Sequence, residues 1–241
     1  FIPGHEIVGT VVGLGADVQG LKMGQRVGVG WQADSCGACE WCRQGDEHLC
    51  AKAQATCVGR NGGYADKIRV NARFAIPVPD ALESEHTAPR LCAGRTVYSP
   101  LRNHGVRPSS RVGVIGIGGL GHLGLQFARA FGAEVTAFST AKDKVAEAKS
   151  LGAHNFVNTR DTGALKKVAG SFDLILSTVS ADLDWQAYVA ALRPKGTLCI
   201  LGVGEAPMQL QGFPLIGGQK AVAGSPTGSP RDLYEMLDVA A

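Results

Sequence analysis

Two patterns of hydrophobic and polar residues divide the chain near residue 100. Before it, short apolar runs such as "IVGTVVGLG" and "QRVGVG" alternate with glycine and other turn residues, without long helical periodicity, which is typical of a β-rich domain. From Val112 onward, short apolar strands alternate with helical repeats, for example Trp185, Tyr188, Val189 and Leu192. This alternation predicts parallel strands joined by crossover helices.

The predicted fold class is therefore α/β, with a β-rich domain over residues 1–100 and a doubly wound parallel sheet over residues 101–241. The second part contains six apolar runs that qualify as strands, the number in a complete dinucleotide-binding sheet. The segment 102–110, "RNHGVRPSS", is the expected link between the two domains.

Composition narrows the class of protein without naming a function. The 241 residues are 45% hydrophobic and 19% charged, which is typical of a globular chain. The net charge of +3 is spread along the chain, so we expect neither a nucleic-acid nor a membrane partner. Because no long apolar run and no secretory signal is present, we expect a cytoplasmic protein whose seven cysteines serve thiolate or metal chemistry.

Four cysteines fall within fifteen positions, at Cys36, Cys39, Cys42 and Cys50. The spacing CxxCxxCx7C lets four thiolates surround one tetrahedral Zn²⁺, and a shell of four cysteines leaves no open position for substrate. We therefore predict a structural zinc site. Two alternatives are four unrelated thiols and a zinc ribbon that binds nucleic acid, although the acidic residues of "GACEWCRQGDEH" speak against phosphate contact.

A glycine-rich stretch, "GIGGLG" at residues 116–121, follows an apolar strand and opens a helical pattern. In that context Gly116 permits a tight turn, Gly118 lets the backbone approach a pyrophosphate, and Gly121 lets helix and strand pack closely. The stretch predicts a dinucleotide site, with a turn that binds no ligand as the alternative.

The residues after the next strand indicate which dinucleotide is bound. An NAD enzyme places an acid there for the ribose 2′-hydroxyl, but this chain has "FSTAKDK". Ser139 and Thr140 offer hydroxyls, Lys142 and Lys144 offer positive charge, and Asp143 falls beyond the strand end. This set attracts a 2′-phosphate, so the sequence favours NADP over NAD.

At its start the chain resembles a known family. The pattern of "GHE", with His5 and Glu6, followed by Gly9, Gly15 and Val18, is similar to the signature of the zinc-containing alcohol dehydrogenases in the medium-chain dehydrogenase/reductase superfamily. The cysteine cluster, "GGYADK", "LCAG.TVYSPL" and "GIGGLGHLGLQFA" follow in that family's order. The whole chain resembles the cinnamyl-alcohol-dehydrogenase-like, NADPH-dependent aldehyde reductase branch.

The resemblance implies a GroES-like β domain, a Rossmann domain, a catalytic zinc, and hydride transfer between NADP(H) and a primary alcohol or aldehyde. It matches His5 and Cys92 to zinc ligands and Glu6 to an acid that can enter the zinc shell; this ligand set is the family's own. It also implies a possible homodimer. The matched cofactor contacts are Thr96, Gly116, Gly118, Gly119, Leu120, Gly121, Ser139, Thr140, Lys144, Thr178, Gly202, Ser225, Pro226 and Thr227.

The chain departs from the family pattern in two ways. It starts after the position of the family's third catalytic ligand, a cysteine upstream of "GHE", and ends on an apolar helical pattern, so we expect segments to be missing at both ends. Arg90 and Arg95 stand where the family has apolar residues, and Arg95 shares a helical face with Cys92. The alternative function is therefore a catalytically impaired, nucleotide-binding remnant of such an enzyme.

Overall fold

The computed structural model describes residues 1–241 and divides into two compact units. The first unit comprises Phe1–Arg95 together with Thr227–Ala241, and the second comprises Thr96–Pro226. The division falls within one helix, α3 (Ala93–Asn103). None of the helices is long and apolar enough to cross a membrane.

The first unit is β-rich, as the glycine-punctuated apolar runs predict. Its three-stranded sheet has the order β1-β2-β5 with antiparallel pairing, and β3 and β4 form a separate antiparallel pair. Val27, Val29 and Ala75 form its buried cluster, because alternate residues of a strand face the same side. The strands are β1 (Ile7–Thr10), β2 (Arg26–Val29), β3 (Gln32–Asp34), β4 (Gln54–Ala55) and β5 (Ile76–Pro77).

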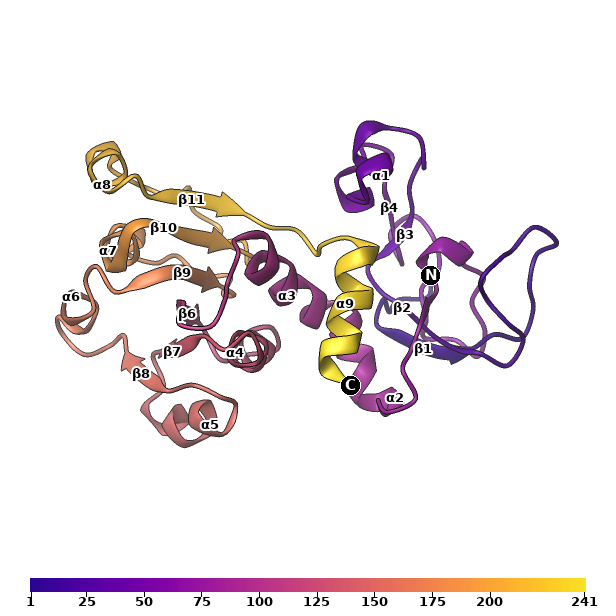
Figure 1. The fold of residues 1–241 in the computed structure, drawn as a ribbon, viewed down its shortest axis with the longest axis horizontal. Coiled ribbons are helices and arrows are strands. Elements are labelled where there is room, and N and C mark those ends of the chain that lie inside the picture. Colours follow the sequence, from indigo (N-terminus) through magenta and orange to yellow (C-terminus); the bar gives the residue numbers. More distant parts are fainter. The chain divides into compact units, whose positions relative to one another are not determined.

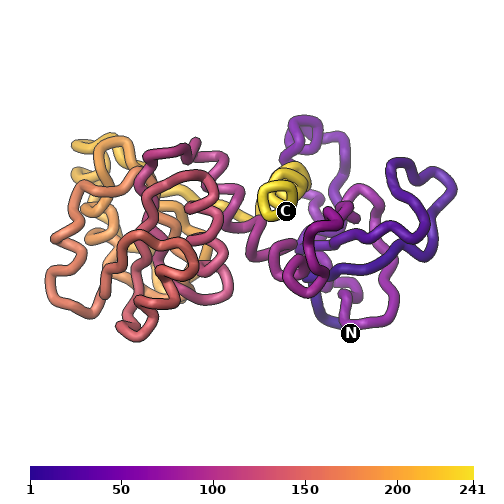
Figure 2. Tube along the Cα trace, turned by 60° about the horizontal axis from the view of Figure 1, so that its bottom comes forward, coloured from indigo at the N-terminus to yellow at the C-terminus, as the bar shows by residue number.

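Short helices complete the first unit. The chain's last helix, α9 (Pro230–Ala240), packs against β5 and carries a capping box between Ser229 and Asp232. Figure 2 shows this C-terminal segment, in yellow, beside the β-rich part of the chain. The other helices and 3₁₀ turns of this unit are α1 (Glu40–Gln44), η1 (Glu47–Leu49), η2 (Ala72–Phe74), α2 (Ser84–Thr87) and η3 (Ala88–Leu91).

The second unit is built on a six-stranded parallel sheet with the order β11-β10-β9-β6-β7-β8 (Figure 1). This confirms the predicted doubly wound α/β sheet and its strand number. The strands are β6 (Arg111–Ile115), β7 (Glu134–Ser139), β8 (Asn155–Asn158), β9 (Phe172–Ser177), β10 (Leu192–Ile200) and β11 (Ala221–Gly224). The connecting helices and 3₁₀ turn are α4 (Gly121–Ala130), η4 (Lys142–Lys144), α5 (Val145–Ser150), α6 (Ala164–Lys167), α7 (Trp185–Ala191) and α8 (Gly212–Gly218).

Alternation along β6 shows how both faces of this sheet are covered. Val114 faces α4, where its Cγ1 lies 3.4 Å from the place a methyl group on Gly124 would take. The next residue, Ile115, faces the other way and belongs to the buried cluster of Trp185 and Val189 on α7. Because successive side chains point to opposite faces of a strand, α4 and α7 lie on opposite faces of the sheet.

The observed division differs from the predicted ranges 1–100 and 101–241 in two respects, and the first is that the boundary falls between Arg95 and Thr96. The second is that Thr227–Ala241 lies in the first unit, although it follows the last strand of the parallel sheet. The apolar face of α9, with Leu233, Met236 and Leu237 buried, explains this placement, because it packs on the β-rich unit. Periodicity predicts such a face but not which partner it covers.

Candidate functional site

The four-cysteine lobe is built from one continuous segment between β3 and β4. Cys36 follows the end of β3, Cys39 is the N-cap of α1, Cys42 lies within α1, and Cys50 is the C-cap of η1. Gly45 ends α1 with a φ of 88°, a left-handed conformation that glycine adopts without strain. This turn reverses the chain, so the last cysteine comes back to the first three.

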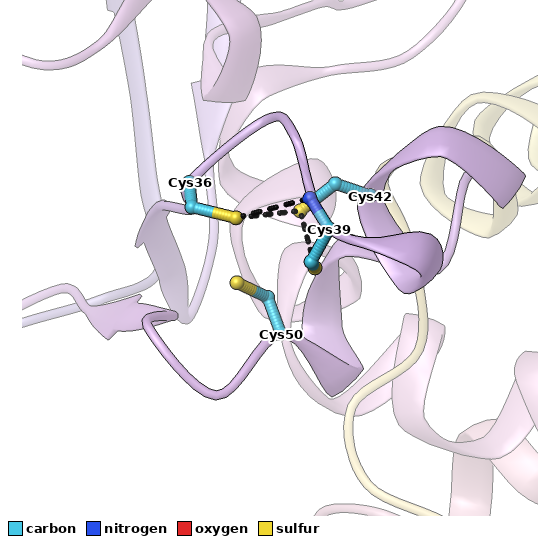
Figure 3. Close-up of side chains that lie close together, drawn as sticks. All are labelled: Cys36, Cys39, Cys42 and Cys50. Atoms are coloured by element: carbon cyan, nitrogen blue, oxygen red, sulfur yellow. Dashed lines mark hydrogen bonds between the residues drawn. The ribbon is translucent and has the colours of Figure 1, made fainter.

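Figure 3 shows the four sulfur atoms converging on one point from these turns. All four lie within 4.8 Å of one another, with 3.9 Å between the sulfurs of Cys36 and Cys42 and 3.5 Å between those of Cys39 and Cys42. Zn–S bonds of about 2.3 Å in a tetrahedron place neighbouring sulfurs roughly 3.8 Å apart. The donor set therefore fits one zinc ion.

Backbone amides favour the thiolate form in this lobe. The amide of Cys39 donates to the sulfur of Cys36 at 3.3 Å, and that of Lys52 donates to the sulfur of Cys50 at 3.3 Å. Hydrogen bonds from the Ala38 and Cys39 amides lower the pKa of the Cys36 thiol to about 6. Four sulfur donors leave no coordination position open, so the lobe fits a structural ion and no substrate.

A second donor group comes from distant parts of the first unit. His5 and Glu6 directly precede β1, whereas Cys92 lies between η3 and α3. The Nε2 atom of His5 is 3.3 Å from the sulfur of Cys92, and one donor atom of each of the three residues lies within 4.8 Å of the others. The edge of Trp31 packs on the His5 ring, with ring centroids 5.0 Å apart, which fixes the imidazole plane.

The chemistry of this trio fits an open zinc site. Imidazole, thiolate and carboxylate are all zinc ligands, and three protein donors leave a fourth position for water or substrate. Burial, and then the negative charge of Glu6, raises the pKa of the Cys92 thiol to about 11. The thiol must lose its proton to bind metal, so zinc binding here is coupled to proton release.

Arg95 lies in the same unit, one helical turn beyond Cys92. Its side chain is only 2% exposed, and its Nε and Nη2 atoms are buried without a hydrogen-bond partner. Burial lowers the pKa of its guanidinium to about 10. The charge of Arg95 partly offsets the rise in the pKa of the Cys92 thiol, so the two groups interact, although Cys92 lies in the turn before α3 and not on the helix itself. The second unusual arginine, Arg90, instead donates from Nη1 to the carbonyl of His86 at 2.5 Å.

The glycine-rich turn connects β6 to α4 in the second unit. Gly116 has a φ of 88°, and a methyl group there would collide with Val179. A methyl group on Gly121 would collide with the carbonyl oxygen of Gly116, so glycine is required for the close approach of helix and strand. Both observations agree with the roles that the sequence predicts for these residues.

The other side of this turn is open. A methyl group on Gly118 or Gly119 would meet no atom within 4 Å, and both residues immediately precede Leu120, the N-cap of α4. Amides at a helix N-terminus beside free space suit an anionic diphosphate. The turn therefore has the close packing and the open cradle that a dinucleotide needs.

Three further residues that the sequence predicts as cofactor contacts lie at the ends of strands near the glycine-rich turn. Thr178 follows β9, and its hydroxyl donates to the Ile115 carbonyl at 2.8 Å, which braces the turn. Gly202 follows β10, where a side chain would collide with the Val179 backbone. Ser139 ends β7, and its hydroxyl accepts from the Ala141 amide at 3.1 Å.

The remaining predicted contacts are spread over both units. Lys144 donates from Nζ to the Ile117 carbonyl at 2.7 Å, directly on the glycine-rich turn. Thr140 follows Ser139 at the end of β7, and Thr96 is buried on α3. The segment after β11 contributes Ser225 and Pro226 to the second unit and Thr227 to the first.

Comparisons with known proteins agree with this geometry. Residues 1–80 match the family described as "Alcohol dehydrogenase GroES-like domain", and residues 119–241 match "Zinc-binding dehydrogenase". The aldehyde reductase AdhA of Synechocystis sp. is 42% identical over 239 residues, which cover 99% of this chain and 71% of that protein. The chain belongs to the zinc-binding alcohol dehydrogenases.

Solved structures support the same assignment. A cinnamyl alcohol dehydrogenase from Sorghum bicolor superposes with a TM-score of 0.94 at 39% identity, covering 99% of this chain and 71% of that one. A cinnamyl alcohol dehydrogenase (CAD) from Helicobacter pylori, complexed with NADP(H), gives 0.91 at 35% identity with the same coverage. The predicted membership in the cinnamyl-alcohol-dehydrogenase-like branch, with a GroES-like and a Rossmann-like fold, is therefore confirmed.

Three features of this dehydrogenase chain escaped the sequence prediction. The Thr178 hydroxyl bonds to β6, Arg95 is enclosed by protein atoms, and Lys142 forms an ion pair with Asp161 at 3.1 Å. Each depends on which strands and helices become neighbours. For the third feature, the ion pair of Lys142, the run of hydroxyl and lysine residues after β7 was a usable sequence signal; the other two features had none.

Proposed function

We propose that this chain transfers a hydride between NADP(H) and a primary alcohol or its aldehyde at a zinc ion held by His5, Cys92 and Glu6. The relative from Synechocystis is named an aldehyde reductase, and the solved relative from Helicobacter pylori carries NADP(H). The lobe of Cys36, Cys39, Cys42 and Cys50 holds a second, structural zinc.

Each residue of the trio has a distinct role as a zinc ligand. His5 binds through Nε2 in the orientation that Trp31 fixes, and Cys92 binds through its sulfur once its proton has left. Glu6 supplies a third donor that is exposed and can yield its position. A zinc ion bound there supplies Lewis-acid polarisation of the substrate oxygen. The trio thus keeps one position free for the reacting oxygen.

The second unit orients the dinucleotide. Gly118 and Gly119 leave room for the diphosphate at the start of α4, and Thr178 keeps the turn in place through its bond to Ile115. Bound NADPH supplies the hydride, while the protein supplies position and charge. Ser139, Thr140 and Lys144 contact the 2′-phosphate. Later nucleotide contacts come from Thr96, Gly202, Ser225, Pro226 and Thr227 and from the turn residues Gly116, Leu120 and Gly121.

The observation that carries the proposal is the 3.3 Å approach of the His5 and Cys92 donor atoms, which lie 87 positions apart in the sequence. Zinc content per chain, measured by elemental analysis, tests it together with aldehyde-dependent NADPH oxidation. Two zinc ions and turnover are expected for the native chain. One ion, retained in the variant Cys92→Ser, contradicts the proposal.

A second candidate is a nucleotide-binding chain with impaired chemistry, and Arg95 favours it. A buried guanidinium near Cys92 opposes the binding of a cation by electrostatic repulsion. This candidate predicts NADPH binding and one zinc ion per chain, without aldehyde-dependent oxidation. The zinc and turnover measurements separate the two candidates directly.

We further infer that the chain forms a homodimer and works in the cytoplasm. β11 is an edge strand of the parallel sheet, and Phe213 and Ile216 on the neighbouring α8 are 81% and 76% exposed. An open strand edge beside exposed apolar side chains favours pairing with a second copy. All seven cysteines are free thiols, which suits a reducing compartment. Sedimentation equilibrium tests the dimer, and a monomer at micromolar concentration contradicts it.

A further inference from the structure

The loops after β7 and β8 leave the sheet side by side. These strands are parallel neighbours, and their register pairs Ser139 with Asn158, the last residue of each. The amide of Thr159 donates to the Ser139 carbonyl at 2.9 Å, which joins the two loops where they begin. Charged residues of the second loop therefore lie beside the predicted 2′-phosphate contacts of the first.

The position of η4 relative to the nucleotide site is fixed by Lys144. Its Nζ atom donates to the Ile117 carbonyl within the glycine-rich turn at 2.7 Å and lies 3.8 Å from the carboxylate of Glu147. Lys142 is the first residue of the same 3₁₀ turn. Both lysines are thus held at the carboxyl end of the sheet, where nucleotides bind to this class of fold.

Lys142 is already bound to a carboxylate. Its Nζ atom lies 3.1 Å from Oδ1 of Asp161. The same oxygen accepts from the Nδ2 atom of the buried Asn158 at 2.8 Å, which holds Asp161 in place. The lysine is 73% and the aspartate 53% exposed. A ligand anion can therefore reach this pair from solvent.

We propose that Lys142 is a second cation for the 2′-phosphate of the nucleotide and that Asp161 competes with that phosphate for it. This inference rests on the proposed use of NADP(H). Asp161 is then a specificity-determining residue that weakens the preference for phosphorylated nucleotides. Lys144, whose ammonium group bonds to the turn, supplies the permanent part of that preference.

The sign of the Asp161 effect follows from the charges. A bound 2′-phosphate carries about −1.5 to −2 charges at neutral pH. Asp161 repels it and also neutralises Lys142. The substitution Asp161→Asn removes both effects and keeps the side chain's size. Because exposed ion pairs hold side chains only weakly in place, freeing Lys142 outweighs the loss of its orientation.

Isothermal titration of the full chain with adenosine 2′,5′-bisphosphate and with 5′-AMP tests the proposal without turnover. Lys142→Gln is expected to weaken binding of the bisphosphate about 3- to 10-fold, and Asp161→Asn to tighten it about 2- to 5-fold. Binding of 5′-AMP changes less than about 2-fold in both variants, because it lacks the 2′-phosphate. Asp143→Asn is the matched control: it removes an equal charge from η4, the turn that carries Lys142, but breaks no ion pair, and it changes the ratio of the two affinities less than Asp161→Asn does.

The outcomes separate this inference from the proposed function. A native chain that binds both nucleotides equally contradicts the use of NADP(H) and the inference with it. A native chain that prefers the bisphosphate, with the preference unaltered in Lys142→Gln, overturns the inference alone. In the double variant Lys142→Gln/Asp161→Asn, the gain from Asp161→Asn is expected to shrink. A full gain there shows direct repulsion and contradicts competition for Lys142.

Discussion

Two groups of candidate metal ligands in the first unit are built in opposite ways. Cys36, Cys39, Cys42 and Cys50 come from one continuous segment, offer four identical donors, and receive backbone amide hydrogen bonds. His5, Glu6 and Cys92 come from distant segments, offer three different donors, and include an exposed carboxylate. The first group forms a closed shell, whereas the second leaves a position open.

This difference separates a site that shapes its own segment from one that depends on the rest of the fold. The cysteine lobe has only short helices and strands, so a zinc ion held there would contribute directly to the folding of that segment. The second group exists only after the segment before β1 has met the start of α3. Stability is therefore expected to depend on the first group and turnover on the second.

The largest expected effect is the loss of the structural ion. Cys42→Ser removes a buried donor, and we expect it to reduce zinc by about one ion per chain and the free energy of unfolding by about 3 kcal/mol or more. Elemental analysis and thermal unfolding, with and without added zinc, measure both. An unchanged unfolding transition after loss of that ion would contradict the expected dependence of stability on the four-cysteine group.

The corresponding substitution in the second group is expected to reduce activity strongly and stability only slightly. Cys92→Ser is expected to reduce kcat/KM for aldehyde reduction at least about 100-fold, while the free energy of unfolding changes by less than about 1 kcal/mol. Steady-state kinetics and thermal unfolding test the two expectations together. Exposed Glu85, changed to Gln, is a control that leaves both quantities unaltered. A large stability loss in Cys92→Ser with retained activity would reverse the assignment of the two groups.

The glycine-rich turn extends the comparison to a second continuous segment. Gly121→Ala forces a methyl group against the Gly116 carbonyl, so we expect a destabilisation of about 2–3 kcal/mol. Gly118→Ala meets open space, so stability changes by less than about 1 kcal/mol, while NADPH binding weakens about 10-fold because the methyl group fills the cradle. Denaturant unfolding and fluorescence titration separate these effects. Equal destabilisation by both substitutions would show that the turn has no open side.

The sequence predicts those parts of the molecule that rest on local patterns. The cysteine spacing brings four donors together within one short segment, and the glycine positions indicate which atoms approach closely, as Gly121 shows. The six-stranded sheet follows from the alternation of strands and helices. In each case, either the interacting residues are close in sequence or the residue type permits only one local backbone arrangement.

The features that local sequence patterns do not predict depend on tertiary neighbours. The pairing of Lys142 with Asp161 requires the register of β7 with β8, and periodicity does not fix that register. The trio of His5, Glu6 and Cys92 was reached through the family resemblance, since nothing local links residues 87 positions apart. The packing of α9 on β5 likewise depends on a partner surface far away in the sequence.

The smallest expected effect concerns the buried charge near the second metal group. Arg95 has two buried nitrogen atoms without partners, whereas Asp232, an acid whose charge raises the pKa of Arg95, already accepts from the Ser229 amide at 2.9 Å. Because an unsatisfied buried cation costs more than an apolar side chain of similar size, Arg95→Met is expected to stabilise the chain by about 1 kcal/mol.

The same substitution removes a positive charge beside Cys92, so zinc retention at the second group is expected to rise during dialysis against a weak chelator. Arg90→Met is the matched control, since that arginine only donates to the His86 carbonyl, and it leaves zinc retention unaltered. Denaturant unfolding and zinc analysis of the two variants decide the matter. If Arg95→Met instead destabilises the chain and releases zinc, Arg95 stabilises the second metal group. The two groups then differ in their surrounding charges as well as in their donor atoms.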